Sequence, residues 1–276
     1  NQKVELLSPA GNLEKLKIAI KYGADAVYAG VSHFSLRIRA GKEFTFETFK
    51  EGIDYAHARG KKVYATINGF PFNSQIELLK KHIATMAALK PDGFIVAAPG
   101  VVKLCREIAP EIDIHLSTQA NVLNYLDAQV FWDLGVKRIV VAREISLKDV
   151  MEIKKHLPDM EIEIFVHGSM CFAYSGRCLV SAVQMGRVPN RGSCANDCRF
   201  QYTLYAANED HGTLFRLEEE PGIGTYIFNS KDMNLASHIK EILDSGAVDS
   251  LKIEGRTKSP YYAAVTAKAY RNAIDD

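Results

Sequence analysis

The chain has 276 residues, 47% of them hydrophobic and 24% charged, which is the composition of an ordinary globular protein. A formal net charge of +1 excludes a global field that would attract nucleic acid or an anionic membrane, so any basic surface must be local. No apolar run reaches membrane-spanning length, and the N-terminus lacks a charged-then-apolar signal segment.

The five cysteines are an odd number, and four of them are clustered. A disulfide framework would pair them evenly and scatter them, so we expect a reduced, cytoplasmic protein without a membrane partner. The chain begins with Asn and stops after AYRNAIDD. We therefore expect a trimmed piece of a longer protein, which leaves room for a C-terminal domain.

The first stretch, VELLSPAGNLEKLKIAIKYGADAVYAG, predicts a strand–helix–strand step. An apolar run over Val4–Leu7 ends at Ser8-Pro9, because proline cannot continue a ladder. Asn12 is suited to cap the following helix, and Gly23 is suited to end it. Ala26–Ala29 then begins a second buried strand.

This step recurs along the chain, with a Gly or Pro before each new strand. Further helices are predicted over Phe46–Ala58, Ile76–Leu89, Val101–Ile108, Leu123–Leu134 and Leu147–His156. After the cysteines, strand-like runs at Tyr202–Tyr205 and Thr225–Phe228 flank a polar loop, Asn208–Pro221. The step then resumes with a helix over Asn234–Asp244, a strand over Ser250–Ile253 and a helix over Tyr261–Ile274.

Eight strand starts can be counted, at Val4, Ala26, Val63, Phe94, Ile112, Val136, Ile162 and Ser250. Eight alternating units predict one α/β domain over residues 1–276, a TIM-like (β/α)8 barrel. Residues 168–228 would form a cysteine-rich insertion after strand seven. An open doubly wound sheet is the weaker alternative, since no Gly-rich phosphate fingerprint follows the first strand.

In a barrel, the residues just past each strand share one mouth. They are Ser8, Gly30, Asn68, Ala98, Gln119, Arg143, His167 and Glu254-Gly255-Arg256. Loops are polar simply because they are exposed, which accounts well for Asn68 and Gln119. It accounts less well for the charges of Glu254 and Arg256, which directly follow a buried strand. We take Arg143, His167 and Glu254 as candidate catalytic residues.

The cysteine cluster runs as C-x6-C-x15-C-x3-C, at Cys171, Cys178, Cys194 and Cys198. Thiolates are soft ligands that suit zinc or an iron–sulfur cluster. The spacing matches neither two zinc knuckles nor a ferredoxin pattern, so it predicts metal binding and leaves the metal open. Cys105 lies in an apolar helical stretch and is expected to be a core residue.

Basic residues gather in three of the predicted βα loops. The cysteine segment itself is basic and carries aromatic residues, which can hold phosphates and stack unpaired bases. Two further groups could join it across the mouth: Arg37 with Arg39, and Arg256 with Lys258. These four residues and Gln119 form the candidate substrate-binding set. Three basic groups on one face favour an anionic partner, although a solvated charged loop explains each group singly.

Other catalytic patterns fit poorly, since no HExxH, GxSxG or P-loop occurs. His167 lies four residues from Cys171, but a Cys–His protease would leave the other cysteines of the cluster unexplained. His115, in the middle of a predicted strand, is expected to be a satisfied structural histidine.

The run EIFVHGSMCFAYSGRCLVS resembles the signature of the collagenase-like peptidase family U32. LLSPAGN, GADAVYAG, HLSTQANVLN, NRGSCANDCR, YIFNSKD and SLKIEGRTKSPYY are also similar to that family, so the resemblance spans the chain. Within the family, SLR-R, the C-x3-C pair and NSKD are most similar to members that hydroxylate tRNA.

The resemblance implies prephenate-dependent hydroxylation of the wobble uridine of tRNA to 5-hydroxyuridine, with tRNA and prephenate as partners. It also implies a 4Fe–4S cluster rather than zinc. Cys171, Cys178 and Cys194 match ligand positions, and Cys198 would be the fourth ligand because the downstream cysteine of some relatives is absent. Related members act on 23S rRNA or ubiquinone, and a homo-oligomer or a further family subunit is possible. The alternatives are a U32-type protease and a zinc-stapled, non-catalytic RNA-binding module.

Overall fold

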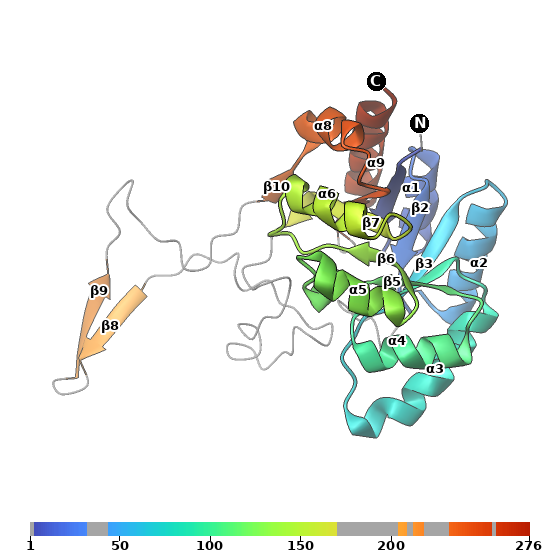
Figure 1. Ribbon diagram of the computed structural model, residues 1–276, viewed down its shortest axis with the longest axis horizontal. Coiled ribbons are helices and arrows are strands. Elements are labelled where there is room, and N and C mark those ends of the chain that lie inside the picture. Colours follow the sequence, from blue (N-terminus) through green and yellow to red (C-terminus); the bar gives the residue numbers. More distant parts are fainter. Residues whose placement is uncertain (1–2, 32–43, 170–203, 209–211, 218–231, 256–257) are drawn as a thin grey trace.

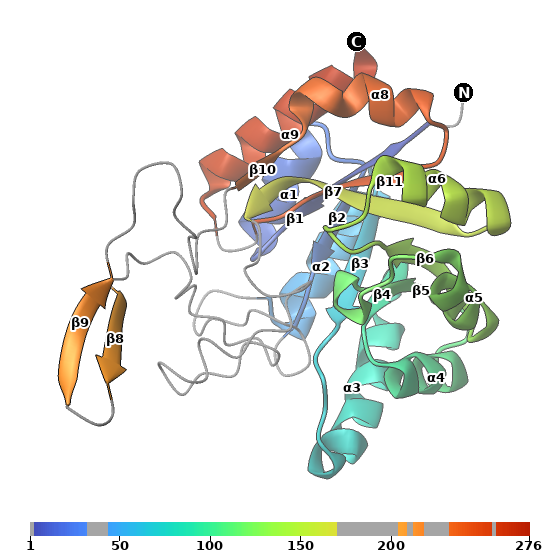
Figure 2. The same cartoon turned by 60° about the vertical axis from the view of Figure 1, so that its left-hand side comes forward.

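A computed structural model describes residues 3–31, 44–169, 204–208, 212–217, 232–255 and 258–276 (Figure 1). Eight parallel strands alternate with helices and close into a barrel (Figures 1 and 2). The closure is made by β7, which pairs in parallel with both β6 and β11. The prediction of a (β/α)8 barrel is therefore confirmed.

The barrel strands are β1 (Glu5–Pro9), β2 (Ala26–Ala29), β3 (Lys62–Ile67), β4 (Gly93–Val96), β5 (Asp113–Leu116), β6 (Val136–Val140), β7 (Glu161–Ser169) and β11 (Ser250–Ile253). The surrounding helices are α1 (Leu13–Lys21), α2 (Phe46–His57), α3 (Ile76–Ala88), α4 (Pro99–Ile108), α5 (Tyr125–Asp133), α6 (Leu147–His156), α8 (Ile239–Asp244) and α9 (Pro260–Asp275). Short 3-10 turns lie at η1 (Asn73–Gln75), η2 (Thr118–Ala120) and η6 (Ala236–His238).

Several helices, among them α1, α6 and α9, begin where the sequence supplies a capping side chain. Asn12 accepts a hydrogen bond from the Lys15 N–H at the start of α1, as predicted. Ser146 and Ser259 cap α6 and α9 in the same way. These caps lie a few residues beyond the strand ends, so each cap fixes the point at which the chain leaves the mouth and turns back along the barrel.

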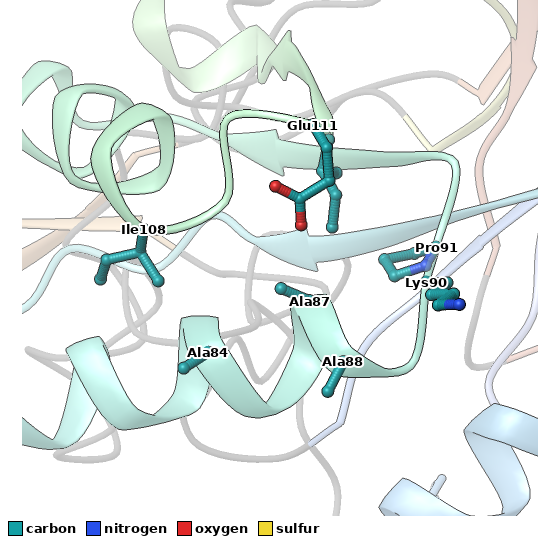
Figure 3. Close-up of a pocket in the computed structure, with 8 residues that line it drawn as sticks. Ala84, Ala87, Ala88, Lys90, Pro91, Ile108 and Glu111 are labelled. Atoms are coloured by element: carbon teal, nitrogen blue, oxygen red, sulfur yellow. The ribbon is translucent and has the colours of Figure 1, made fainter.

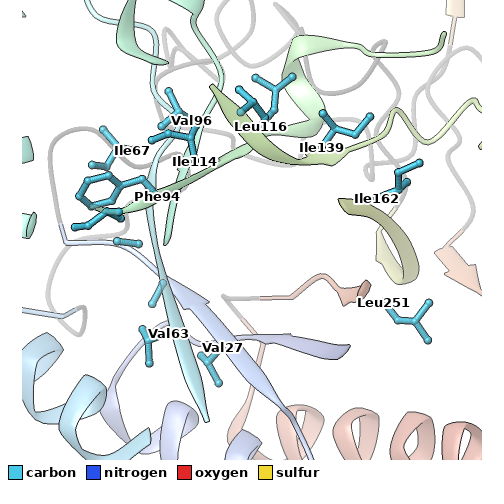
Figure 4. Close-up of a cluster of buried hydrophobic side chains, with 14 of the residues drawn as sticks. Val27, Val63, Ile67, Phe94, Val96, Ile114, Leu116, Ile139, Ile162 and Leu251 are labelled. Carbon is cyan, nitrogen blue, oxygen red and sulfur yellow. The ribbon is translucent and has the colours of Figure 1, made fainter. Parts of the chain in front are cut away.

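The main hydrophobic core is the layer between the barrel and its helices. Figure 4 shows side chains of this layer, among them Val27, Phe94 and Leu251, arranged around the ring of strands. These three side chains are fully buried, and each such burial stabilises the fold by roughly 1.5–3 kcal/mol. Cys105 is buried in the same layer, as expected, and burial raises the pKa of its thiol to about 12.

Three local predictions were wrong. Strand β1 continues through Pro9, because the neighbouring Ala10 N–H donates to the Tyr28 carbonyl and the ladder needs no N–H from proline. The predicted polar loop Asn208–Pro221 contains a strand, β9 (Thr213–Leu217), which pairs antiparallel with β8 (Leu204–Asn208).

The third concerns the predicted helix over Asn234–Asp244. It is split into η6 and the six-residue α8, because Asn234 instead ends a short strand, β10 (Asp232–Asn234), antiparallel to the end of β7. The predicted strand-like run Thr225–Phe228 lies outside the described residues. None of the helices that the structure describes is long and apolar enough to cross a membrane.

Candidate functional site

The barrel mouth brings together three predicted residues from strands that are neighbours only in the closed barrel. Arg143 follows β6, His167 lies in β7 and Glu254 follows β11. Arg143 Nη2 lies 2.9 Å from Glu254 Oε2, with only 7% and 9% of the two side chains exposed. At this burial the pair is weakly screened by solvent, so it is a fixed local dipole rather than a solvated surface pair.

An aromatic ring supports the cation of this pair. The Arg143 guanidinium carbon lies 4.0 Å from the centre of the Phe165 ring. Lys252 Nζ lies 5.2 Å from the same ring and 4.4 Å from the ring of Tyr28. Cations over ring faces are attracted by the ring quadrupole, so the Phe165 ring helps to hold both cations in place.

His167 is held by a tyrosine from α9. Its Nδ1 lies 3.1 Å from Tyr270 Oη, and the Tyr270 hydroxyl donates to the Val166 carbonyl at 2.8 Å. The single proton of this hydroxyl faces two carbonyl oxygens, those of Val166 and, at 3.2 Å, the Asn234 side chain, so the tautomer with a proton on His167 Nδ1 satisfies the contact between the two residues. Burial raises the pKa of Tyr270 to about 12, which keeps that hydroxyl protonated. In this tautomer Nε2 is the proton-accepting nitrogen of His167.

The backbone joins His167 and Glu254 directly. The Glu254 N–H donates to the His167 carbonyl at 2.9 Å, and the Tyr262 hydroxyl donates to the Glu254 carbonyl at 2.8 Å. Gly168 has a φ of +126°, and a Cβ there would come within 2.6 Å of the Glu254 Cβ. Only glycine permits this approach without strain, so Gly168 is needed to seat Glu254 beside His167.

The other predicted residues are less closely joined. Gln119 lies in η2, and its loop is tied to the Arg143 loop where the Ala142 N–H donates to the Val122 carbonyl at 3.1 Å. Lys258 is exposed, with its Nζ 6.0 Å from the ring of Tyr262. The remaining candidates lie outside the described residues: Arg37, Arg39, Arg256, Cys171, Cys178, Cys194 and Cys198. The chain reaches Ser169, two residues before Cys171, as the last residue of β7, at the mouth.

A charged cluster inside the barrel was not predicted from the sequence. Arg138 donates to Glu5 at 2.6 Å, to Glu161 at 2.8 Å and to Glu163 at 3.1 Å, and Lys252 Nζ lies 3.5 Å from Glu163. Burial opposes the charge of Arg138, but Glu5 and Glu163 outweigh it and raise its pKa. Charges at alternate positions in the strands, as in EIEIF and SLKIE, were the signal.

Two aromatic side chains complete this cluster. Tyr64 donates to Glu5 at 2.6 Å, and its ring centre lies 4.5 Å from that of His115. Burial, and then the charges of Arg138 and Lys252, lower the pKa of His115 well below its usual value. His115 is structural, as predicted, but it is not satisfied: its buried Nδ1 has no hydrogen-bond partner among the described residues.

The described residues line two notable cavities outside the barrel interior. One of about 270 Å³ borders Arg143 and Phe165 and is otherwise mainly apolar, between α6 and the short α8. The other, of about 580 Å³, lies between α3 and the end of α4, where Ala84, Ala87 and Ala88 face Ile108 (Figure 3). Its remaining walls, which include Pro91 and Glu111, precede β4 and β5, so it opens at the end of the barrel opposite the mouth.

Comparison with known proteins places these features in a family. The model of peptidase family U32 matches residues 11–276. A Helicobacter pylori protein named tRNA hydroxylation protein P is 74% identical over 99% of this chain and 65% of its own length. An Escherichia coli protein named 23S rRNA 5-hydroxycytidine C2501 synthase is 34% identical over 100% of this chain and 40% of its own.

A solved structure described as a U32 peptidase has the same fold, with a TM-score of 0.60 at 16% identity over 94% of this chain and 96% of that one. The chain spans about two thirds of the length of the Helicobacter pylori relative, 65%.

Proposed function

The chain belongs to peptidase family U32. Because it is also similar to tRNA hydroxylation proteins of that family, we propose that it hydroxylates a uridine base of tRNA. The observation that carries this proposal is the 74% identity to tRNA hydroxylation protein P along 99% of the chain. The similarity to a 5-hydroxycytidine synthase supports the same chemistry, the entry of a hydroxyl group into a pyrimidine ring. The finer proposal is C5 of the wobble uridine, with prephenate as co-substrate.

The mouth supplies groups suited to such a reaction. Replacing C5–H of uracil by C5–OH removes one proton and two electrons from the base and adds the equivalent of a hydroxide ion, so the reaction also needs a two-electron acceptor. His167, fixed by Tyr270 with Nε2 as the acceptor, can take the proton from C5. Arg143, held between Glu254 and Phe165, offers donors to a base carbonyl or to a developing negative charge.

The four clustered cysteines suit a 4Fe–4S cluster by their donor chemistry. Cys171, Cys178, Cys194 and Cys198 would hold it, and when bound it would supply one-electron transfer. The described part of the chain supports this position, since β7 ends at the mouth two residues before Cys171. The cationic side chains of Arg37, Arg39, Arg256 and Lys258 would receive phosphates or the carboxylates of prephenate.

A peptidase activity has less support in the residues that the structure describes. His167 contacts the phenolic side chains of Tyr270 and Tyr262. A covalent protease needs one activated nucleophile beside its base, whereas the four clustered cysteines suit a shared metal centre. The hydroxylase is therefore the function that we favour.

The function is tested by nucleoside mass spectrometry of tRNA from a strain that lacks the protein. We expect 5-hydroxyuridine and its derivatives to disappear and to return when the gene is restored. Unchanged 5-hydroxyuridine together with lost gelatin cleavage would support the peptidase instead.

The cofactor is tested separately on protein purified without oxygen. Iron and acid-labile sulfide should each approach about four per chain in the wild-type protein. They should fall in Cys198→Ala and stay unchanged in the matched control Cys105→Ala, whose thiol is buried in the core. Stoichiometric zinc, or iron that survives the Cys198 change, would contradict the proposed cluster.

A further inference from the structure

One face of α9 carries an exposed tyrosine whose side chain has no structural role in the barrel. Tyr261 is 78% exposed, the highest value among the large hydrophobic side chains that the structure describes. Val265, one turn further on, is 46% exposed, and Lys268 and Asn272 continue the same line. With about 3.6 residues per turn, these four positions lie on one side of the helix.

The opposite side of α9 is fully used in packing. Ala263, Thr266, Ala267 and Tyr270 are buried against the barrel and its neighbouring helices. The exposure of Tyr261 therefore does not come from a loosely packed helix. The outward face is a separate surface. Together with the exposed Lys258, which precedes the helix, we call it the α9 strip and define it as Lys258, Tyr261, Val265 and Lys268.

The charge around the strip is one-sided. Residues 255–274 contain the basic residues Arg256, Lys258, Lys268 and Arg271 and no Asp or Glu, in a chain with 34 basic and 33 acidic residues. Arg271 is paired with Asp25 and Asp275, at 2.9 and 3.3 Å. Lys258 and Lys268 are exposed and form no ion pair with a described carboxylate, so among the described residues the strip carries two unpaired cations, one before and one after Tyr261 in the chain.

The strip begins at the mouth. Lys258 and Tyr261 follow β11 by a few residues, and Ser259 caps the helix by accepting from the Tyr262 N–H. Tyr262 in turn donates to the carbonyl of Glu254, the partner of Arg143. In Figure 2 the first turn of α9 lies beside β10, on the side of the barrel where the β8–β9 hairpin stands. The backbone next to Tyr261 is thus anchored to the candidate site, while the Tyr261 side chain is exposed to solvent.

We infer that the α9 strip is the surface along which a single-stranded segment of RNA reaches the mouth, with Tyr261 stacking on an unpaired base and the two lysines contacting phosphates. This inference rests on the proposed function and names how its substrate is held. Unpaired bases stack on exposed aromatic rings, and lysines beside them bind the backbone. Tyr261 and Lys268 are seven residues apart, about 10 Å along the helix, which is within the reach of two or three nucleotides.

A protein partner is the competing occupant, since an exposed tyrosine and valine also suit a protein interface. The lysines before and after Tyr261, which pair with no described carboxylate, favour a polyanion. The two occupants differ in one measurable respect. Phosphate contacts make binding depend steeply on salt, whereas a protein contact would appear in the association state of the protein.

The test is the affinity of the whole protein for a labelled anticodon stem-loop RNA, measured by fluorescence anisotropy across a series of salt concentrations. We expect Tyr261→Ala to weaken binding by about 5- to 150-fold, which corresponds to the roughly 1–3 kcal/mol attributed to one stacked base. Tyr261→Phe should bind like the wild type, because the ring is kept. Lys258→Gln and Lys268→Gln should each lower the slope of log affinity against log salt by about one.

Tyr22→Ala is the matched control, because this tyrosine is 40% exposed but lies at the C-terminal end of α1, away from the mouth. Equal affinities of Tyr261→Ala and Tyr22→Ala would overturn the inference while leaving the proposed function intact. A change in association state without a change in RNA affinity would assign the strip to a protein partner and would also overturn it. If the wild-type protein neither binds nor modifies tRNA, the proposed function fails, and the inference fails with it.

Discussion

Replacing Arg138 by methionine tests whether the charged cluster inside the barrel is a structural requirement. Arg138 is 6% exposed and bonds Glu5, Glu161 and Glu163 at 2.6, 2.8 and 3.1 Å. Removing one partner of a buried pair costs about 3–5 kcal/mol, because the remaining charge stays buried without compensation. Glu161 is 31% exposed, so solvent screens it and it adds less than about 1 kcal/mol.

The remaining contacts place the expected loss near the lower end of that range. Glu5 keeps hydrogen bonds from Tyr64 and Ser250, and Glu163 keeps Lys252 at 3.5 Å. We therefore expect Arg138→Met to lower the free energy of unfolding by about 3 kcal/mol. Adding Glu163→Gln to the same chain removes the carboxylate that has lost Arg138, so the double variant should recover part of the lost free energy of unfolding.

The assay is urea denaturation followed by circular dichroism, with Lys137→Met as the matched control. Lys137 is the adjacent cation on the same strand, but it is half exposed and pairs with Asp113 on the surface, so its loss should cost less than about 1 kcal/mol. Equal effects of the two variants, or a loss below about 1 kcal/mol for Arg138→Met, would refute the reasoning that burial makes this cluster indispensable.

Three further outcomes follow from the site and the interior. Because burial lowers the pKa of His115, the folded state favours the neutral ring, whereas the unfolded chain takes up a proton near pH 6.5. The free energy of unfolding should therefore be constant, as far as His115 is concerned, above pH about 6.5 and fall as the pH drops below it. The fall should reach about 1.4 kcal/mol between pH 7.5 and 5.5, and a His115→Phe variant that keeps the same slope would contradict it. His167→Gln should reduce the rate of uridine hydroxylation by about 10²- to 10⁴-fold with little change in tRNA affinity; an unchanged rate would exclude His167 as the base. Tyr270→Phe removes the donor to the Val166 carbonyl, so it should cost about 1–3 kcal/mol of stability and also slow hydroxylation; a stability loss with full activity would show that His167 does not need this tyrosine.

Most of the scaffold could be predicted because each unit carries its own local signals. The periodic apolar faces, the Asn12 cap and the Gly or Pro at each helix end lie within a few residues of the element that they define. The predicted strand starts all fall within one residue of the strands in the structure. Local sequence also located the mouth, since the residues past parallel strands share one end of a barrel.

What could not be predicted depends on contacts between distant strands. β10 is three residues long and exists only because the end of β7 offers it a pairing edge. The Arg138 cluster joins β1, β6 and β7, so its ion pairs form only when strands that are far apart in the chain come together in the barrel. Arg143 and Glu254 were each placed at the mouth, but their ion pair required the closed barrel, in which residues 111 positions apart become neighbours.

The most direct test of the account is the 5-hydroxyuridine content of tRNA from a strain that lacks the protein and carries one of three versions of the gene. Wild type and Lys137→Met should restore the modified nucleoside, because the surface pair of Lys137 lies outside the mouth. Glu254→Gln should restore little of it at equal protein level, since the change removes the charge that holds Arg143 at the site. Full restoration by Glu254→Gln would contradict the claim that uridine hydroxylation takes place at this mouth.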